Sequence, residues 1–253
     1  MDLGRSFAFP FRDPAWVPRL GVGALLELIP LLLALPLALG AFETREGTPR
    51  LLVMLLFPAV LGLASRWVQL GYLRRLAQAV LEDPAARLPR WDRFEQDLTE
   101  GLKLWLVTVA LFLPALGVAA ILVFLTLVAG VPALFWLPLL LVAAPLVVAI
   151  TVYLPAALLT AIARRDLAAA FDVGSVWAVV ARDGGLYLLG FVVAIAAEVL
   201  AQFGVLACCI GIFFTRFAAH CVTVHAFCCA YRGLTAAGPV PGGSGAGGPF
   251  GGQ

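Results

Sequence analysis

Apolar residues run almost without interruption from Leu102 to Ala163. The hydrocarbon core of a bilayer takes roughly 20 helical residues to cross, so this run is too long for one crossing. Gly130-Val131-Pro132 is the natural break. We therefore expect two membrane-spanning helices here, Lys103 to Ala129 and Ala133 to Ala163, in an all-helical integral membrane protein.

The composition supports a membrane protein over a soluble one. Of the 253 residues, 62% are hydrophobic and 13% are charged, and the mean hydropathy is +1.01. Soluble domains carry about 25% charged residues, so the excess apolar surface must face lipid. The net charge of +2 is too small to indicate nucleic-acid binding. The expected partners are membrane lipids, and no nucleic acid.

Four further spans are expected from the same apolar pattern, which makes six in three hairpins. They are Leu20 to Phe42, Leu51 to Tyr72, Leu186 to Leu206, and a last span from the turn at Cys208-Cys209-Ile210-Gly211 to Tyr231-Arg232. We expect the second helix to run on to Leu81, where Asp83-Pro84 stops it.

The chain divides into three parts by composition. Residues 1–19 form an aromatic and basic interfacial lead-in, in which Pro10, Pro14 and Pro18 prevent one continuous helix. Residues 20–232 form the helical membrane domain. Residues 233–253 are rich in Gly, Pro, Ser and Ala, and we expect them to be disordered.

The longest polar stretch, Leu88 to Lys103, is predicted to be an amphipathic helix on the membrane surface. Asp92 is its expected N-cap, with Glu95 completing a capping box. Its expected apolar face is Phe94, Leu98, Gly101, Leu102 and Trp105, and its expected polar face is Arg93, Glu95, Asp97 and Glu100. Two interpretations stay open: a solvated helix that joins two spans, which we favour, and a platform for a protein partner or lipid headgroups.

A second amphipathic segment is expected from Arg164 to Asp183. Its apolar side is predicted to carry Leu167, Phe171, Gly174, Ala178 and Ala181.

Basic residues set the expected orientation. The lead-in has three, Arg74 to Lys103 has six, and Arg164 to Arg182 has three, whereas the link between the first two spans has only Arg45 and Arg50. Both termini and both amphipathic helices are therefore expected in the cytoplasm, with the protein in the plasma membrane.

Ionisable residues inside the expected spans are candidate functional sites. Glu27 and Arg66 are each eight residues from a basic residue at the same face, Arg19 and Arg74, so they lie at matched depth and can pair across the first hairpin. A structural ion pair, or separate snorkelling to the interface, is the interpretation we prefer.

Glu198 and Gln202 lie one turn apart in the fifth span. The opposite charges available to Glu198 in its own hairpin are Arg216, His220 and His225. A proton or cation relay and a hydrogen-bonded structural contact are both compatible with this pattern.

Cys221, His225 and Cys229 share one face of the last span. The outer two are about 12 Å apart by helical rise, so the three cannot surround one ion. The five cysteines all lie in this last apolar region and are interpreted as small apolar packing residues. We expect no metal and no cofactor.

Several landmarks resemble one family of prokaryotic membrane proteins, the domain of unknown function 4013. They are Phe11-Arg12-Asp13-Pro14-Ala15-Trp16, Leu70-Gly71-Tyr72-Leu73-Arg74, Leu88-Pro89-Arg90-Trp91-Asp92, Gly101-Leu102-Lys103, Phe171-Asp172, Tyr187-Leu188-Leu189, Cys208-Cys209-Ile210-Gly211 and Ala226 through Tyr231-Arg232. The resemblance covers nearly everything before Gly233. It implies a helical integral membrane protein and no particular activity.

The sequence carries no motif of a metalloprotease, a serine hydrolase elbow or a phosphate loop, so we expect no enzymatic activity. Two functions remain. Transport or handling of a small molecule or lipid is favoured by proline-broken helices and by Glu27, Glu198 and His225. The alternative is a structural or scaffolding subunit that binds a protein partner at its cytoplasmic face, favoured by the few polar residues in the third and fourth spans.

Overall fold

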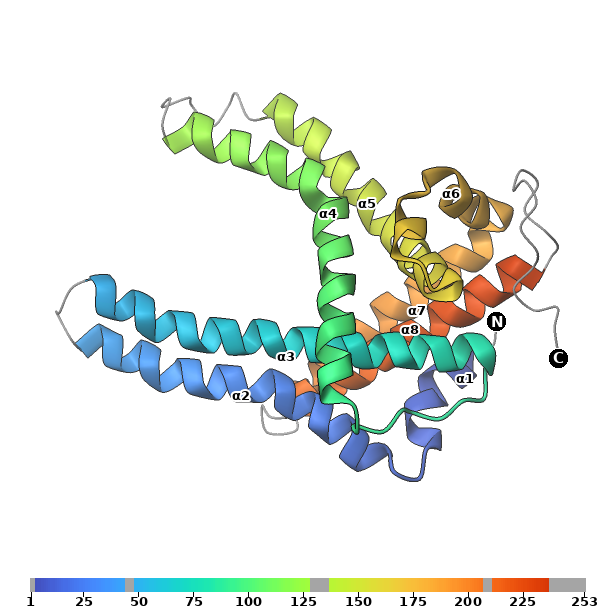
Figure 1. Cartoon of the computed structure of the whole chain (residues 1–253), viewed down its shortest axis with the longest axis horizontal. Coiled ribbons are helices and arrows are strands. Elements are labelled where there is room, and N and C mark those ends of the chain that lie inside the picture. Colours follow the sequence, from blue (N-terminus) through green and yellow to red (C-terminus); the bar gives the residue numbers. More distant parts are fainter. Residues whose placement is uncertain (1–2, 44–47, 128–136, 207–210, 237–253) are drawn as a thin grey trace. The chain divides into compact units, whose positions relative to one another are not determined.

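The computed structural model describes residues 3–43, 48–127, 137–206 and 211–236, and every element in this part of the chain is helical (Figure 1). The chain divides into two compact units. The first comprises Met1–Lys103 and Asp183–Ala237, and the second comprises Leu104–Arg182 and Gly238–Gln253. The predicted break at Gly130-Val131-Pro132, the turn at Cys208-Cys209 and residues 237–253 of the tail lie outside the described residues.

The first unit holds most of the helices. They are α1 (Leu3–Ala8), the 3-10 helix η1 (Phe9–Arg12), α2 (Trp16–Glu43), α3 (Thr48–Glu82), the first turns of α4 (Phe94–Leu127), α7 (Gly184–Gln202), η4 (Phe203–Leu206) and α8 (Gly211–Ala236). Helix α2 packs on α3, α7 packs on α8, and α8 also contacts α2 and α3 (Figure 1).

The lead-in is split, as its prolines predict. Between η1 and α2, the Asp13 carboxylate accepts the Ala15 amide at 2.8 Å, and the Trp16 amide donates to the Asp13 carbonyl at 3.0 Å. These bonds form a turn that starts α2 at Trp16, four residues before the predicted Leu20. Pro18 lies in the first turn of α2, where a helix does not need its amide.

Helix α3 runs through the second expected span and ends at Glu82, which confirms its predicted extension to Leu81. The Asp83 carboxylate then accepts the Ala85 amide at 2.8 Å and forms a turn. At the same end, the Arg232 guanidinium donates to the carbonyls of Val80 and Leu81 at 3.2 and 2.8 Å. The last carbonyls of α3 thus have a cationic partner.

The predicted surface helix from Leu88 to Lys103 is not a separate element. Residues 88–93 are non-helical, and α4 begins at Phe94 and continues without a break to Leu127. Its first backbone bond joins the Asp97 amide to the Arg93 carbonyl at 2.8 Å, so Arg93 rather than the predicted Asp92 precedes the helix. The predicted end at Lys103 is wrong because no proline or glycine follows before Pro114.

The predicted faces of this segment are correct in part. Gly101 is buried and Arg93 and Glu95 are exposed, as predicted, whereas Phe94 of the predicted apolar face is 46% exposed. Asp97, assigned above to the polar face, is only 1% exposed. An assignment from helical periodicity places charged residues outside, but here the buried carboxylate of Asp97 is paired with the guanidinium of Arg75 on α3.

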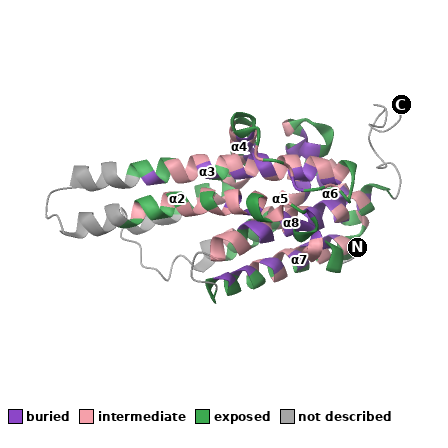
Figure 2. Cartoon of the chain, turned by 90° about the horizontal axis from the view of Figure 1, so that it is seen from below, coloured by how far each residue is buried: buried purple, intermediate pink, exposed green. Residues whose placement is uncertain are grey.

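Helices α7 and α8 enclose the main core of the first unit. Val193, Ala197 and Ala201 of α7 face Ala219, Val222 and Ala226 of α8, and Phe7 of the lead-in packs against this cluster. Figure 2 shows buried residues along both of these helices. Small side chains let two apolar helices approach closely. Helix α8 continues to Ala236, with Leu234 buried, so its predicted end at Arg232 is four residues too early.

The second unit contains the rest of α4, α5 (Leu137–Arg164), η3 (Leu167–Phe171) and α6 (Val173–Arg182). The predicted amphipathic segment from Arg164 to Asp183 is thus two helices, separated at Asp172. Its buried residues include Val176, Val179 and Val180, while Phe171, Gly174 and Ala181 of the predicted apolar side are exposed. That assignment was wrong because it assumed one helical phase across the break.

Five described helical stretches are long and apolar enough to cross a membrane, judged by length and composition. They are Trp16–Leu35, Phe94–Ile121, Ala143–Arg164, Gly184–Leu206 and Gly211–Ala236.

Candidate functional site

Four helices of the first unit bring ionisable side chains into one cluster. Glu27 of α2 places Oε1 3.7 Å from Nη1 of Arg66 on α3. The same oxygen lies 3.9 Å from Nδ1 of His220 on α8. His220 Nε2 lies 3.5 Å from Oε1 of Glu198 on α7. An imidazole therefore stands between two carboxylates. We call Glu27, Arg66, Glu198 and His220 the acid–histidine cluster.

Gln69 holds the arginine of this cluster in place. Its side-chain amide donates to the Gly23 carbonyl at 3.0 Å, and its amide oxygen accepts from Arg66 Nη1 at 3.3 Å. Gln69 is 1% exposed. A buried amide with both ends hydrogen-bonded has one favourable orientation, so it fixes the guanidinium beside Glu27.

Arg216, one turn before His220 on α8, lies close enough to interact electrostatically with both Glu27 and His220. Two carboxylates and two guanidiniums then sum to zero charge when the imidazole is neutral. A near-neutral set is the arrangement that a low-dielectric region tolerates, because unpaired charges there are costly. Uptake of one proton changes this sum to +1.

The members of the acid–histidine cluster differ in exposure. The side chains of Glu27 and His220 are 14% and 16% exposed, whereas those of Arg66 and Glu198 are 44% and 43% exposed. His220 thus links an outer carboxylate to an inner one. The Nδ1 atom of His220 is buried and has no hydrogen bond within the described residues. It is therefore available for a proton or a donor group.

The structure brings together three of the five side chains singled out from the sequence. The pairing of Glu27 with Arg66 is confirmed, and Glu198 joins them through His220. Gln202 is exposed at the last residue of α7. His225 lies elsewhere: its Nδ1 is 3.3 Å from Ser6 Oγ, and its ring stacks on Phe9 with centroids 4.3 Å apart.

The face that carries Cys221, His225 and Cys229 contains one close pair. Cys229 Sγ lies 3.7 Å from Nε2 of His225. Within the described ranges, no group of three or more His, Cys, Asp or Glu side chains is arranged to hold a metal ion.

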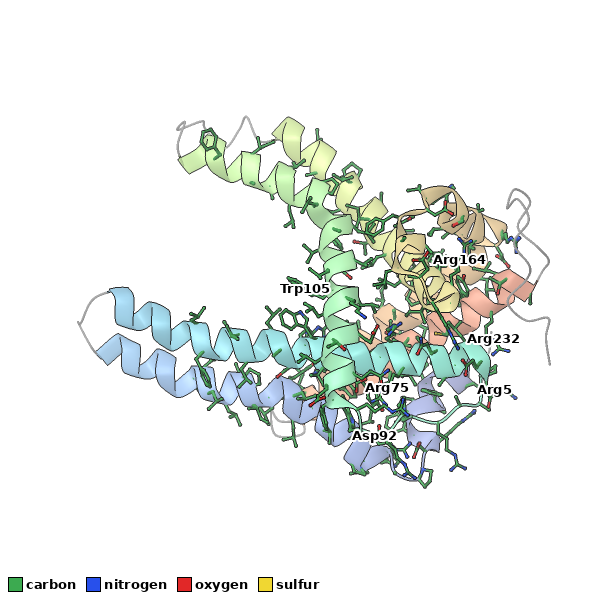
Figure 3. The ribbon with its side chains drawn as sticks, viewed as in Figure 1. Arg5, Arg75, Asp92, Trp105, Arg164 and Arg232 are labelled. Carbon is green, nitrogen blue, oxygen red and sulfur yellow. The ribbon has the colours of Figure 1, made fainter. Side chains whose placement is uncertain are left out.

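A second polar network, which sequence reasoning missed, joins α3 to the start of α4. Arg75 donates from Nε and Nη2 to the two carboxylate oxygens of Asp97, at 2.7 and 2.6 Å. The same guanidinium donates to Asp92 Oδ1 at 3.2 Å and to the Arg90 carbonyl at 3.0 Å (Arg75 and Asp92 are labelled in Figure 3). Bidentate arginine–carboxylate pairs are strong and directional, so this network fixes α4 on α3.

Two glycines allow this close crossing. A Cβ atom on Gly71 of α3 would overlap the backbone of Asp97, and a Cβ atom on Gly101 of α4 would overlap the backbone of Trp67. Each helix thus presents a glycine to the other helix's backbone. Both glycines stand in landmarks quoted for the family resemblance. A single sequence does not show that each of them lies against the backbone of the other helix.

The non-helical residues 88–93, before α4, contact α3 and the start of α2. The Trp91 ring stacks on Tyr72 with centroids 4.0 Å apart, and its indole donates to the Arg19 carbonyl at 2.7 Å. Arg19 in turn donates to the Leu88 carbonyl and pairs with Asp13. The conspicuous polar stretch of the sequence is therefore held by the lead-in and α3.

The described helices define a class. A chain whose described elements are all helical, with five stretches long and apolar enough to cross a bilayer, is an integral, multi-pass membrane protein.

A family model described as "Protein of unknown function (DUF4013)" matches residues 51–210, more than half of the chain, and the chain belongs to this family. No curated protein matches the sequence. No solved structure matches it either.

Proposed function

We propose that this chain is a non-enzymatic membrane transport protein for a small molecule, in which the acid–histidine cluster binds and releases a proton. One observation carries the proposal: His220 stands between Glu27 and Glu198, with three helices contributing one side chain each. Chains of Asp, Glu and His inside membrane helices are typical of proton relays in pumps and transporters. Histidine exchanges protons near physiological pH.

The composition of the acid–histidine cluster supports proton transfer over a purely structural role. A structural ion pair needs only Glu27 and Arg66, whose charges balance. Here a second carboxylate and an imidazole are added, and the Glu27 to His220 and His220 to Glu198 separations are 3.9 and 3.5 Å. Small movements of α7 or α8 bring such groups into hydrogen-bond distance, because those bonds form at about 2.7–3.2 Å.

We also propose the finer topology: six spans in three hairpins, with both termini and the basic segments in the cytoplasm of a prokaryotic plasma membrane. Helix α3 supplies the sixth span, since its residues 51–65 are apolar without a charged side chain. The excess of Lys and Arg in Arg74 to Lys103 supports the orientation.

Proton flux in reconstituted liposomes tests the proposed function. Liposomes loaded with a pH-sensitive dye receive a potassium diffusion potential through valinomycin, and internal acidification is followed. The wild-type protein is expected to acidify the lumen faster than protein-free liposomes, and Glu27→Gln, Glu198→Gln and His220→Gln to reduce the rate to the protein-free value. Gln202→Ala, one turn from Glu198 and exposed, is the matched control and should keep the wild-type rate.

Each variant is first compared with wild type by size-exclusion elution and helical circular dichroism, so that misfolding is recognised. A wild-type rate equal to that of protein-free liposomes, or folded variants that keep the full rate, contradicts the proposal.

Single cysteines test the topology. In a background without the five native cysteines, Thr48→Cys and Thr99→Cys should react with a membrane-impermeant maleimide from opposite sides of the membrane. Thr99 is exposed on α4, so a cysteine at this position is accessible to the maleimide. Labelling from the same side would exclude the six-span arrangement.

A scaffolding function is the second candidate, and one observation in the second unit favours it. On α6, Val173 and Trp177 are 63% and 56% exposed and lie one turn apart. An exposed aromatic and aliphatic pair on a short helix is compatible with a protein partner. Crosslinking of a photoreactive residue at position 177 to a single protein in whole cells would favour this function; crosslinking to lipid alone would not.

A further inference from the structure

An apolar pocket lies in the first unit, and no residue of the acid–histidine cluster is in its lining. It has a volume of ≈290 Å³. Its walls include three aromatic side chains from the N-terminal segment, Phe7, Phe11 and Trp16, and one from α8, Phe214. The floor is made by small residues of α7 and α8, among them Ala197, Ala201, Ala218 and Ala219.

The chemistry of the walls excludes a polar ligand in the pocket itself. The one hydroxyl in the lining, that of Thr215, donates to the Ala201 carbonyl at 2.7 Å. It is thus satisfied within the protein. The Trp16 ring packs edge-on against Phe214, with centroids 5.7 Å apart. A pocket with no free polar group and with aromatic walls selects an apolar chain.

The surroundings of the pocket are those of a lipid-facing surface. The lining residues from α7 and α8 belong to stretches apolar enough to cross a membrane, Gly184–Leu206 and Gly211–Ala236. Leu200, which lines it, is 56% exposed, and the neighbouring Phe203 is 61% exposed. In a bilayer these side chains face acyl chains, so the apolar molecule present at highest concentration is a membrane lipid.

A cationic residue adjoins the pocket lining in the sequence. Arg12 directly follows the pocket residue Phe11 and is exposed. An arginine guanidinium pairs well with a phosphate group. An acyl-chain pocket with an adjacent exposed arginine matches the two parts of an anionic phospholipid, the chain and the headgroup.

We propose that this pocket binds one acyl chain of an anionic phospholipid whose headgroup phosphate pairs with Arg12. The bound lipid fixes the aromatic lead-in against α7 and α8, because Phe7, Phe11 and Trp16 close over the chain. This inference is independent of proton transfer, since Glu27, Glu198 and His220 do not line the pocket.

Lipid retention measured by native mass spectrometry tests the proposal. The full-length protein is exchanged in micelles containing phosphatidylglycerol or phosphatidylcholine with identical acyl chains, and retained lipid is counted after activation. Wild type should retain one phosphatidylglycerol more strongly than phosphatidylcholine. Arg12→Gln should lower the retention of phosphatidylglycerol about fivefold, because this is the contribution of one basic side chain to binding at an anionic surface. The retention of phosphatidylcholine should stay unchanged.

Leu200→Trp fills the pocket from an exposed position and should lower retention of both lipids. Two matched controls separate the site from the general surface. Leu188→Trp alters an equally exposed leucine of α7 outside the pocket, and Arg87→Gln removes an exposed arginine elsewhere; both should behave as wild type. Equal retention in wild type, Arg12→Gln and Leu200→Trp would overturn the proposal, as would equal losses in the controls.

Discussion

The ion pair between Arg75 and Asp97 gives the sharpest test of how α4 is held on α3. Asp97 is 1% exposed, and the Arg75 side chain is 16% exposed. Removal of one partner of a buried pair costs about 3–5 kcal/mol, because it leaves the other charge without compensation. Arg75→Met leaves the more buried group unpaired, so we expect a loss of about 4 kcal/mol, the middle of this range.

The reverse change should cost less. In Asp97→Leu the guanidinium keeps Asp92 at 3.2 Å and the Arg90 carbonyl at 3.0 Å, and solvent reaches part of it. We expect about 3 kcal/mol. The double variant removes both charges together and should lie within about 1 kcal/mol of wild type, since a buried pair replaced by apolar residues is often neutral. The two single losses then exceed the loss in the double variant by about 7 kcal/mol, which is the coupling in the stabilising direction.

The measurement is equilibrium unfolding in mixed micelles with increasing dodecyl sulfate, followed by tryptophan fluorescence. Trp91, one of the six tryptophans of the chain, stacks on Tyr72 beside the network, so the emission includes a signal from this crossing. Asp92→Asn is the matched control: its carboxylate also contacts Arg75 but is 57% exposed, and an exposed pair is worth about 0–1 kcal/mol. If the single effects of Arg75→Met and Asp97→Leu simply add, the reasoning is refuted.

Three further outcomes are expected, each read as a change in the free energy of unfolding. Gly101→Ala should destabilise strongly because its new methyl meets the backbone of α3, whereas Gly117→Ala on the same helix, with open space around it, should not; equal effects would contradict the close crossing. Glu27→Gln and Arg66→Gln should each be less stable than their double variant, by roughly 1–3 kcal/mol given their partial exposure, and additive effects would show that the two do not interact. Tyr153→Phe removes a 2.7 Å hydrogen bond to a carbonyl of η3 and should cost about 1 kcal/mol, with no loss if solvent replaces it.

Helix positions were largely predictable from the sequence because apolar length decides them. The expected spans over residues 20–42 and 51–72 lie inside α2 and α3. Helix α3 ends before Asp83-Pro84 as predicted, although it continues through Pro58 in its apolar part. The depth argument for Glu27 and Arg66 also succeeded, since helical rise places residues along an axis regardless of neighbours.

The polar segments were predicted less well, for a different physical reason. When the apolar face of a helix is assigned from helical periodicity, the opposite face is assumed to be in water. Asp97 violates this because Arg75, 22 residues earlier, compensates its charge inside the protein. His220 is similar: the sequence named it only as one available charge for Glu198, and its position between two carboxylates depends on how α2, α7 and α8 pack. Such partners are set by tertiary contacts that one sequence does not encode locally.

The contact between Ser6 and His225 has a consequence for biosynthesis. The two residues are 219 positions apart, so at about 5–20 residues per second the ribosome needs roughly 10–45 s to make the second after the first. During that interval Phe9, which is 5% exposed in the finished protein, lacks the ring on which it stacks. The lead-in therefore emerges from the ribosome well before α8, and its packing is completed only when α8 has been made.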